Sequence, residues 1–178
     1  SGESRILVCS DNEDIYPEGV VEENISDVLE EIDLTANKWT LSFIDEQPKV
    51  GTTYKLDSLQ TWETLGDSAA VTMGTGVYET IVKLSRDAAC GNWSIDLGDV
   101  RESARVYINN VYVGCAWAVP FVLDCKNALK KGKNIIRIEV TNLPANRIAD
   151  LDRKGVKWRK MKEINVVDIN YKRTMYEN

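Results

Sequence analysis

Residues 95–124, IDLGDVRESARVYINNVYVGCAWAVPFVLD, decide the fold class. The runs VYI, VYV and FVL are rich in β-branched and aromatic residues, which favour strands, and turn residues separate them. Asn109 and Asn110 stand alone between the first two runs, and asparagine tolerates positive φ better than other non-glycine residues. The pattern therefore predicts antiparallel strands, with a two-residue hairpin of the primed type at the two asparagines.

Strand patterns continue on both sides of this stretch. In residues 38–45, KWTLSFID, Trp39, Leu41 and Phe43 alternate with polar or smaller residues, which predicts a half-buried strand. Further strand-like runs include RILVC near the start, GTGVYETIVKLS, NWSIDLG, NIIRIEVTN and INVVDINYK. At least seven short strands separated by turn signals predict an antiparallel sandwich rather than βαβ units.

Two segments are candidates for short helices. Residues 24–34, NISDVLEEIDL, have a cap-like Ser26 and apolar residues at helical spacing, although the end of this segment could also be a strand. Residues 127–130 predict a single helical turn that ends at Gly132.

Composition excludes several classes of function. A chain of 178 residues fits one domain, and its net charge of −6 argues against binding a nucleic-acid backbone. The absence of histidine excludes Ser-His-Asp and Cys-His catalysis and the usual zinc sites. No apolar run is long enough to predict a membrane span. The opening SGESRILVCS lacks a signal-peptide pattern, so any export signal is expected to have been removed or to lie in a longer precursor.

The four cysteines, Cys9, Cys90, Cys115 and Cys125, have no CxxC spacing. Cys115 and Cys125 fall in predicted strands, where they are expected to be small buried residues rather than a disulfide pair.

Residues 95–142, which extend the opening stretch through CKNALKKGKNIIRIEVTN, resemble a known family. A Leu-Gly strand end, an asparagine hairpin, a glycine, a tryptophan, a Pro-Phe step and ALKKGKN follow one another as in the galactose-binding-like β-sandwich. That sandwich is the sugar-binding domain of family 2 glycoside hydrolases and of related enzymes such as family 106 α-rhamnosidases. The resemblance implies an all-β jelly-roll sandwich with at most short helices over residues 38–178. Residues 1–37 would be an N-terminal extension or linker with a possible edge strand.

The resemblance also implies a function. Such a domain would be a noncatalytic carbohydrate-binding or substrate-positioning part of a multidomain glycoside hydrolase, which acts outside the cell or in the periplasm. Its partners would be an oligo- or polysaccharide and the catalytic domain of the parent chain, since a (β/α)₈ barrel needs roughly 250 residues. Two alternatives stay open: a structural module that packs on a catalytic domain without binding sugar, and a complete small hydrolase or lyase that uses a carboxylate such as Asp150.

Two tryptophans are candidate sugar platforms, because the C–H face of a sugar stacks on indole. Trp117 follows the run VYVGCA and precedes Pro120; the alternative is that it caps the core between the sheets. Trp158 lies in the basic segment KGVKWRKM and could equally anchor a neighbouring domain. Trp39, Trp62 and Trp93 are expected in the core.

Polar side chains cluster in a predicted loop after the strand run RIEV: Asn142, Asn146, Arg147, Asp150 and Asp152. Amides, guanidinium groups and carboxylates donate and accept hydrogen bonds in fixed directions, as hydroxyl recognition requires. The resemblance implies that NLPANRIADLDRKGVKWRKM approaches a neighbouring catalytic domain, with Asn146, Arg147, Asp150 and Trp158 at the relevant positions. Where family 2 domains continue with Ser-Gly-Ile-x-Arg, this chain has WRKMKEINVVD, which argues against a direct part in an active site. The alternative is local turn bonding and a surface Arg147–Asp150 pair worth at most about 1 kcal/mol.

Acidic and basic segments of the sequence raise the question of bound ions and charged ligands. A structural calcium is possible at the acidic segment SDNEDIYPEG, but this segment lacks the ordered EF-hand pattern and could be a solvated loop, so no metal ligands are assigned. The basic clusters LKKGKN and DRKGVKWRKMK could attract an anionic polysaccharide such as a uronate, through Arg147 or Arg159, or could be ordinary solvated lysines.

Overall fold

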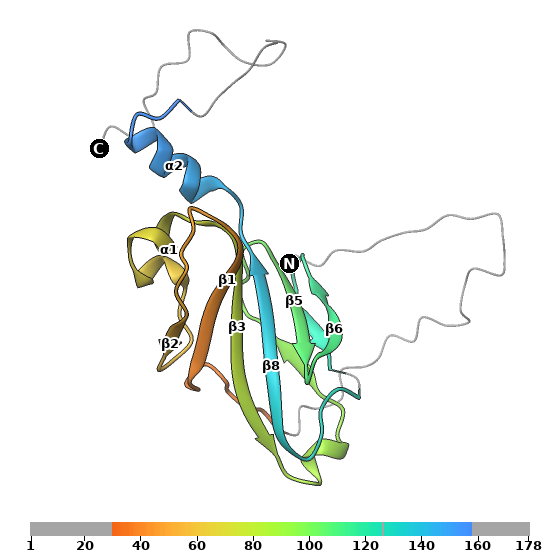
Figure 1. The fold of residues 1–178 in the computed structure, drawn as a ribbon. Helices are drawn as coiled ribbons and strands as arrows, with labels where there is room; N and C mark the ends of the chain where they lie inside the picture. Colours follow the sequence, from red (N-terminus) through yellow and green to blue (C-terminus); the bar gives the residue numbers. More distant parts are fainter. Residues whose placement is uncertain (1–29, 126, 158–178) are drawn as a thin grey trace, which may run out of the picture.

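The computed structural model describes residues 30–125 and 127–157 and shows two antiparallel sheets (Figure 1). The larger sheet has six strands in the order β2-β1-β3-β8-β5-β6, and the smaller sheet pairs β4 with β7. Strand bounds are β1 Trp39–Gln47, β2 Tyr54–Leu56, β3 Met73–Leu84, β4 Ser94–Asp96, β5 Ser103–Ile108, β6 Val111–Ala116, β7 Val122–Asp124 and β8 Gly132–Thr141. The short helices are η2 Trp62–Leu65, α1 Asp67–Val71, η3 Ala88–Cys90 and α2 Ala145–Arg153. The predicted all-β sandwich with short helices is confirmed.

The long strands β3 and β8 form the centre of the larger sheet and pair over their whole length, from Thr75 with Thr141 to Leu84 with Gly132. On β1, Trp39 and Leu41 are buried while Thr40 between them is exposed, which confirms the alternation predicted for residues 38–45. One face of the sheet therefore carries the core and the other carries mostly polar residues.

The core has two parts along this face. One part lies between β3, β5, β6 and β8 and the small sheet, and includes Val82, Ile95, Val106 and Ile136. The other lies between β1, β2 and β3 and the helices η2 and α1, and centres on the aromatic side chains of Trp39, Trp62 and Tyr78.

Close aromatic packing orders this second part of the core. The rings of Trp62 and Tyr78 stack with their centroids 6.3 Å apart, and burial raises the pKa of the Tyr78 phenol to about 12. The Trp62 ring lies directly over Gly76, where an added Cβ would come within 2.5 Å of a ring carbon. Trp39 and Trp62 are core residues as expected, and Trp93 is half buried against the first part of the core.

The predicted hairpin is present. Asn109 and Asn110 have φ of 52° and 68°, as a type I′ turn requires, and the flanking Ile108 and Val111 pair with each other. The Asn109 side chain also accepts a hydrogen bond from the Ile135 amide, which ties the turn to β8.

The helical turn predicted at residues 127–130 is wrong. Asn134 is 0% exposed, and its side-chain oxygen accepts from the Lys130 amide at 2.9 Å. Its Nδ2 donates to the carbonyl oxygens of Lys130 and Gly132, at 2.7 and 3.1 Å. The segment turns around this side chain, so its backbone groups have no need of helical partners. Gly132 has a positive φ of 85°, but it begins β8 instead of ending a helix.

The loop predicted after β8 is also wrong, because α2 follows the strand after three residues. Of the candidate helix at residues 24–34, residues 30–34 have no regular secondary structure, and residues 24–29 lie outside the described residues. The runs RILVC and INVVDINYK and the predicted domain limits at 37 and 38 also involve undescribed residues, so they stay predictions. Cys90, Cys115 and Cys125 are free thiols; Cys125 is buried and Cys115 is half buried. Within the described ranges, no helix has the length and apolar character needed to cross a bilayer.

Candidate functional site at the α2 end of the sandwich

The directions of the strands place the candidate site residues that the structure describes at one end of the larger sheet. Thr141 at the end of β8 pairs with Ser103 at the start of β5, and the next residue, Ala104, pairs with Ala116 at the end of β6. Asn142 and α2 follow Thr141, and Trp117 follows Ala116, so all of them lie at the same end of the sheet, where Figure 1 shows α2. Because β8 and β6 are separated by one strand, about 10 Å lies between their ends.

Asn142 joins two strands. Its side-chain oxygen accepts from the Gly74 amide at 2.9 Å, and its Nδ2 donates to the Thr72 carbonyl at 3.0 Å. Its own backbone amide donates to the Gly74 carbonyl. Both polar ends of this side chain are therefore occupied by backbone groups, and Asn142 fixes the point at which α2 leaves the sheet.

The local sequence explains why α2 begins and ends where it does. Pro144 precedes the first helical residue, and its carbonyl accepts from the Ile148 amide at 2.9 Å. At the other end Gly155 has a φ of 66° and donates to the Asp152 carbonyl, while Val156 donates to the Leu151 carbonyl. These two bonds form a Schellman motif, which requires the left-handed residue that glycine supplies.

One stripe of α2 is an ion network. The buried carboxylate of Asp150 receives Arg147 Nη1 at 3.2 Å and Lys154 Nζ at 2.9 Å. The hydrogen bond from Lys154 is the first cause that holds the pKa of Asp150 below its ordinary value, followed by the positive charges of Lys154, Arg147 and Arg153. The predicted Arg147–Asp150 pair exists, and it belongs to a helix rather than to a surface turn.

The neighbouring stripe of α2 lines a pocket. Asn146, Ala149 and Arg153 share one helix face at i, i+3 and i+7 spacing. Together with residues of η2 and α1 they line an open pocket of about 260 Å³, which is formed by Glu63, Ala70, Val71, Asn146, Ala149 and Arg153. Across it, Asn146 Nδ2 donates to Glu63 Oε1 at 2.6 Å.

This pocket combines three polar groups with an apolar floor. Glu63 supplies acceptors, Arg153 supplies donors, and the Asn146 amide supplies both. The small apolar side chains of Ala70, Val71 and Ala149 form the rest of the lining, which we call the apolar floor. Hydroxyl groups on a ring with apolar C–H faces match this combination. Within the described residues, no group of three or more His, Cys, Asp or Glu side chains could hold a metal ion, and the acidic segment considered for calcium lies outside them.

The two candidate tryptophans differ in what can be said of them. Trp117 is 63% exposed, so the alternative that it caps the core is wrong. Val119 beside it in the chain is exposed as well. Trp158 and Arg159 lie outside the described residues.

Of the six residues that line the pocket, only Asn146 was a candidate from the sequence. Glu63 is 83 residues from Asn146 in the chain and lies in η2 beside the buried Trp62. The pairing of Glu63 with Asn146 depends on how α2 packs against α1, and no local sequence pattern predicts that packing. The helix itself had signals, namely Pro144 before it and the sequence Arg153-Lys154-Gly155 at its end.

No protein-family model matches the chain. Its sequence is 30% identical over 134 residues to a Formosa agariphila protein named "Putative beta-glucuronidase", a match that covers 70% of this chain and 11% of that protein. A rhamnosidase from Novosphingobium sp. PP1Y superposes with a TM-score of 0.63 and 25% identity, over 71% of this chain and 12% of the other. A beta-glucuronidase from Ruminococcus gnavus gives a TM-score of 0.51 at 16% identity, over 60% of this chain and 21% of the other.

The fold is thus an all-β sandwich domain of a kind found within much larger enzymes. Those similar proteins are glycoside hydrolases, and this chain corresponds to about a tenth of the length of the first two.

Proposed function

We propose that this chain is an accessory domain of a larger glycoside hydrolase and that it binds a sugar unit of the substrate in the pocket beside α2. The observation that carries the proposal is the convergence of Glu63, Asn146 and Arg153 around an apolar floor. The domain would hold substrate near a catalytic domain in another part of the parent chain, without a catalytic step of its own. The similarity to short parts of glycoside hydrolases supports this arrangement.

Several finer features belong to the same proposal. They are a jelly-roll strand arrangement of the galactose-binding type over residues 38–178, an extension or linker over residues 1–37, and action outside the cell or in the periplasm. Trp117 would extend the binding surface along the same end of the sandwich, since its exposed indole can stack on a second sugar unit. Trp158 stays a candidate platform.

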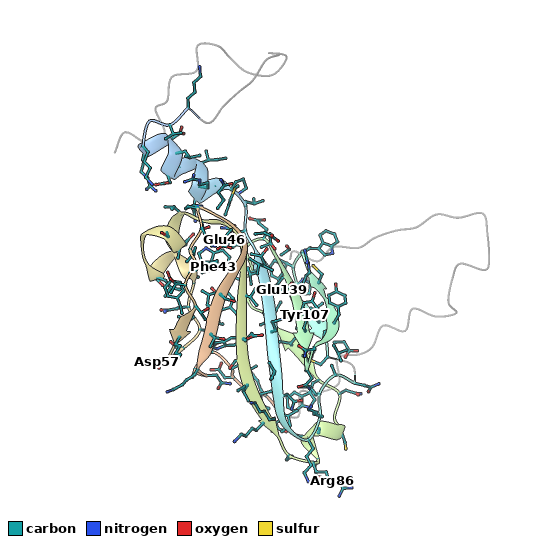
Figure 2. All side chains as sticks on the ribbon, in the orientation of Figure 1. Phe43, Glu46, Asp57, Arg86, Tyr107 and Glu139 are labelled. Atoms are coloured by element: carbon teal, nitrogen blue, oxygen red, sulfur yellow. The ribbon has the colours of Figure 1, made fainter. Side chains whose placement is uncertain are left out.

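Affinity for one sugar unit should be on the order of millimolar, because a small ligand in an open pocket gains little energy per atom. The test is a titration of the chain with glucuronate, rhamnose, galactose and their methyl glycosides, followed by amide NMR. Asn146→Ala and Glu63→Ala should each weaken binding about fivefold or more, because each removes one of the convergent polar groups. Arg86→Ala is the matched control, since Arg86 is exposed at the opposite end of the sheet (Figure 2). Shifts that ignore the pocket residues, or equal affinity in Asn146→Ala, would contradict the proposal.

A second function is favoured by a different observation. Trp117, Val119 and Leu143 are large apolar side chains that are exposed at the α2 end, as expected of a surface that packs on a catalytic domain. In that case the domain would be a structural module that binds no sugar. The indole NMR signal of Trp117 separates the two functions, because a sugar platform shifts on addition of oligosaccharide and a packing surface does not.

A further inference from the structure

The outer face of the larger sheet carries an ordered cluster of charged and aromatic residues on β5, β6 and β8. Across the strands Arg105 pairs with Glu139, and Tyr107 pairs with both Arg137 and Tyr112. These side chains point away from the core because their neighbours Val106, Ile108 and Ile136 point into it. Figure 2 shows Tyr107 and Glu139 close together on this face. We call the five residues Arg105, Tyr107, Tyr112, Arg137 and Glu139 the sheet-face cluster.

The aromatic half of the cluster consists of two tyrosine rings in contact, one of which is exposed. The rings of Tyr107 and Tyr112 lie 5.4 Å apart, and Tyr112 is 54% exposed. The guanidinium carbon of Arg137 lies 4.2 Å from the centre of the Tyr107 ring, which holds both side chains in place. The open ring of Tyr112 therefore rests against a Tyr107 ring that is itself fixed by Arg137.

The charged half of the cluster has more donors than acceptors. Glu139, only 8% exposed, is paired with Arg137 at 3.3 Å and with Arg105 at 3.8 Å. Two guanidinium groups carry ten N–H donors, and one carboxylate has two oxygens to receive them. Arg105 is 60% exposed on its side chain, and the buried Nε of Arg137 has no hydrogen-bond partner among the described residues. Arg137 also faces the exposed Glu79 across β3, so the charges of this face balance, and the donors that stay open to a ligand are those of the exposed Arg105.

We infer that the sheet-face cluster is a second binding site, for a sugar ring that carries a carboxylate or sulfate group. The anionic group would be bound by the exposed donors of Arg105, which can pair with two oxygens of a carboxylate or a sulfate, and the apolar ring face would rest on Tyr112. A cross-strand ladder that only stabilises the sheet would account for the Arg137–Glu139 pair. It gives no reason for the long Arg105 contact or for the open Tyr112 ring. This site shares no residue with the pocket beside α2.

The test is a titration of the whole chain with three probes: an oligogalacturonate, a sulfated galactose oligomer and the neutral galactose oligomer. We expect one or both acidic probes to bind, with amide shifts on β5, β6 and β8 and with affinity that falls as salt is added. The neutral oligomer should leave the amides of the sheet-face cluster unchanged, even if it binds near Trp117 beyond the end of β6. Which acidic probe binds distinguishes carboxylate from sulfate.

Arg105→Gln and Tyr112→Ala should each weaken the acidic probe about tenfold. Both side chains are exposed, so the variants should melt within about 3 °C of the parent. Asn146→Ala in the other pocket should leave this binding unchanged, so the two proposals can fail separately. The inference is overturned if neither acidic probe shifts these strands, if the neutral oligomer shifts them equally, or if both variants bind as the parent does.

Discussion

Asn134 shows how one buried polar residue can determine the path of a whole connection. Its amide satisfies backbone groups of Lys130 and Gly132 and also accepts from Asn109 Nδ2 at 2.8 Å. Since Asn109 is in the hairpin turn, this side chain links the β5–β6 turn to the segment that leads into β8.

We expect Asn134→Ala to lower the free energy of unfolding by about 2–4 kcal/mol, because several buried groups would lose their partner at once. Urea unfolding measures this loss. Asn110→Gly is a suitable control, since Asn110 is exposed with a positive φ that glycine adopts without strain. A loss below about 1 kcal/mol in Asn134→Ala would mean that water replaces the amide.

At the scale of secondary-structure elements, those with a local sequence signal could be predicted, and those that depend on long-range contacts could not. β1 was predictable because Trp39 and Leu41 alternate with polar residues, and the hairpin because two asparagines tolerate positive φ. The Asn127–Lys130 turn was mispredicted because the partner that replaces helical bonding, Asn134, is defined only once β8 is in place. Asn146 was found in the candidate site because it belongs to a polar cluster, while Glu63 was missed because long-range docking brings it there.

The ion network of α2 makes the stability of this helix dependent on pH. Because the pKa of Asp150 is lowered in the folded chain, its contribution is complete above about pH 5 and is lost as the pH falls through 3.8 and below. We expect the amide signals of α2 to show loosening in acid before the sheet does, in an NMR titration from pH 6 downward. Asp150→Asn should remove this acid dependence. Asp99→Asn is the control, because the pKa of Asp99 is also lowered, but by an exposed pair with Arg101 that includes no residue of α2. An unchanged acid transition in Asp150→Asn would contradict the role of the network.

At the scale of the whole molecule, the two parts of the core meet on one sheet face, where Ile138 packs against both. They have different covers: the small sheet over one part, and η2 with α1 over the other. The continuous strands β3 and β8 pass beneath both covers, so the domain should unfold as one unit.

Additivity of mild substitutions tests this view of the core. Ile108→Val removes one methylene group from the first part, and Tyr78→Phe removes the hydroxyl that donates to the Gln60 carbonyl in the second part. Each should cost about 0.5–1.5 kcal/mol, and the double variant should lose their sum within about 0.5 kcal/mol in a single cooperative transition. Two separate transitions in thermal unfolding would show instead that the two parts fold independently.

The two edge strands of the larger sheet determine which sides of the molecule can contact a neighbour. One edge strand is β2, which is three residues long. The other is β6, whose pairing with β5 is interrupted by a register shift beside Val113. Short and irregular edge strands offer few consecutive backbone groups to an incoming strand, and this limits the edge-to-edge pairing that leads to aggregation. Neighbouring domains or molecules must then approach this sandwich through its faces and ends, which is where both proposed sites lie.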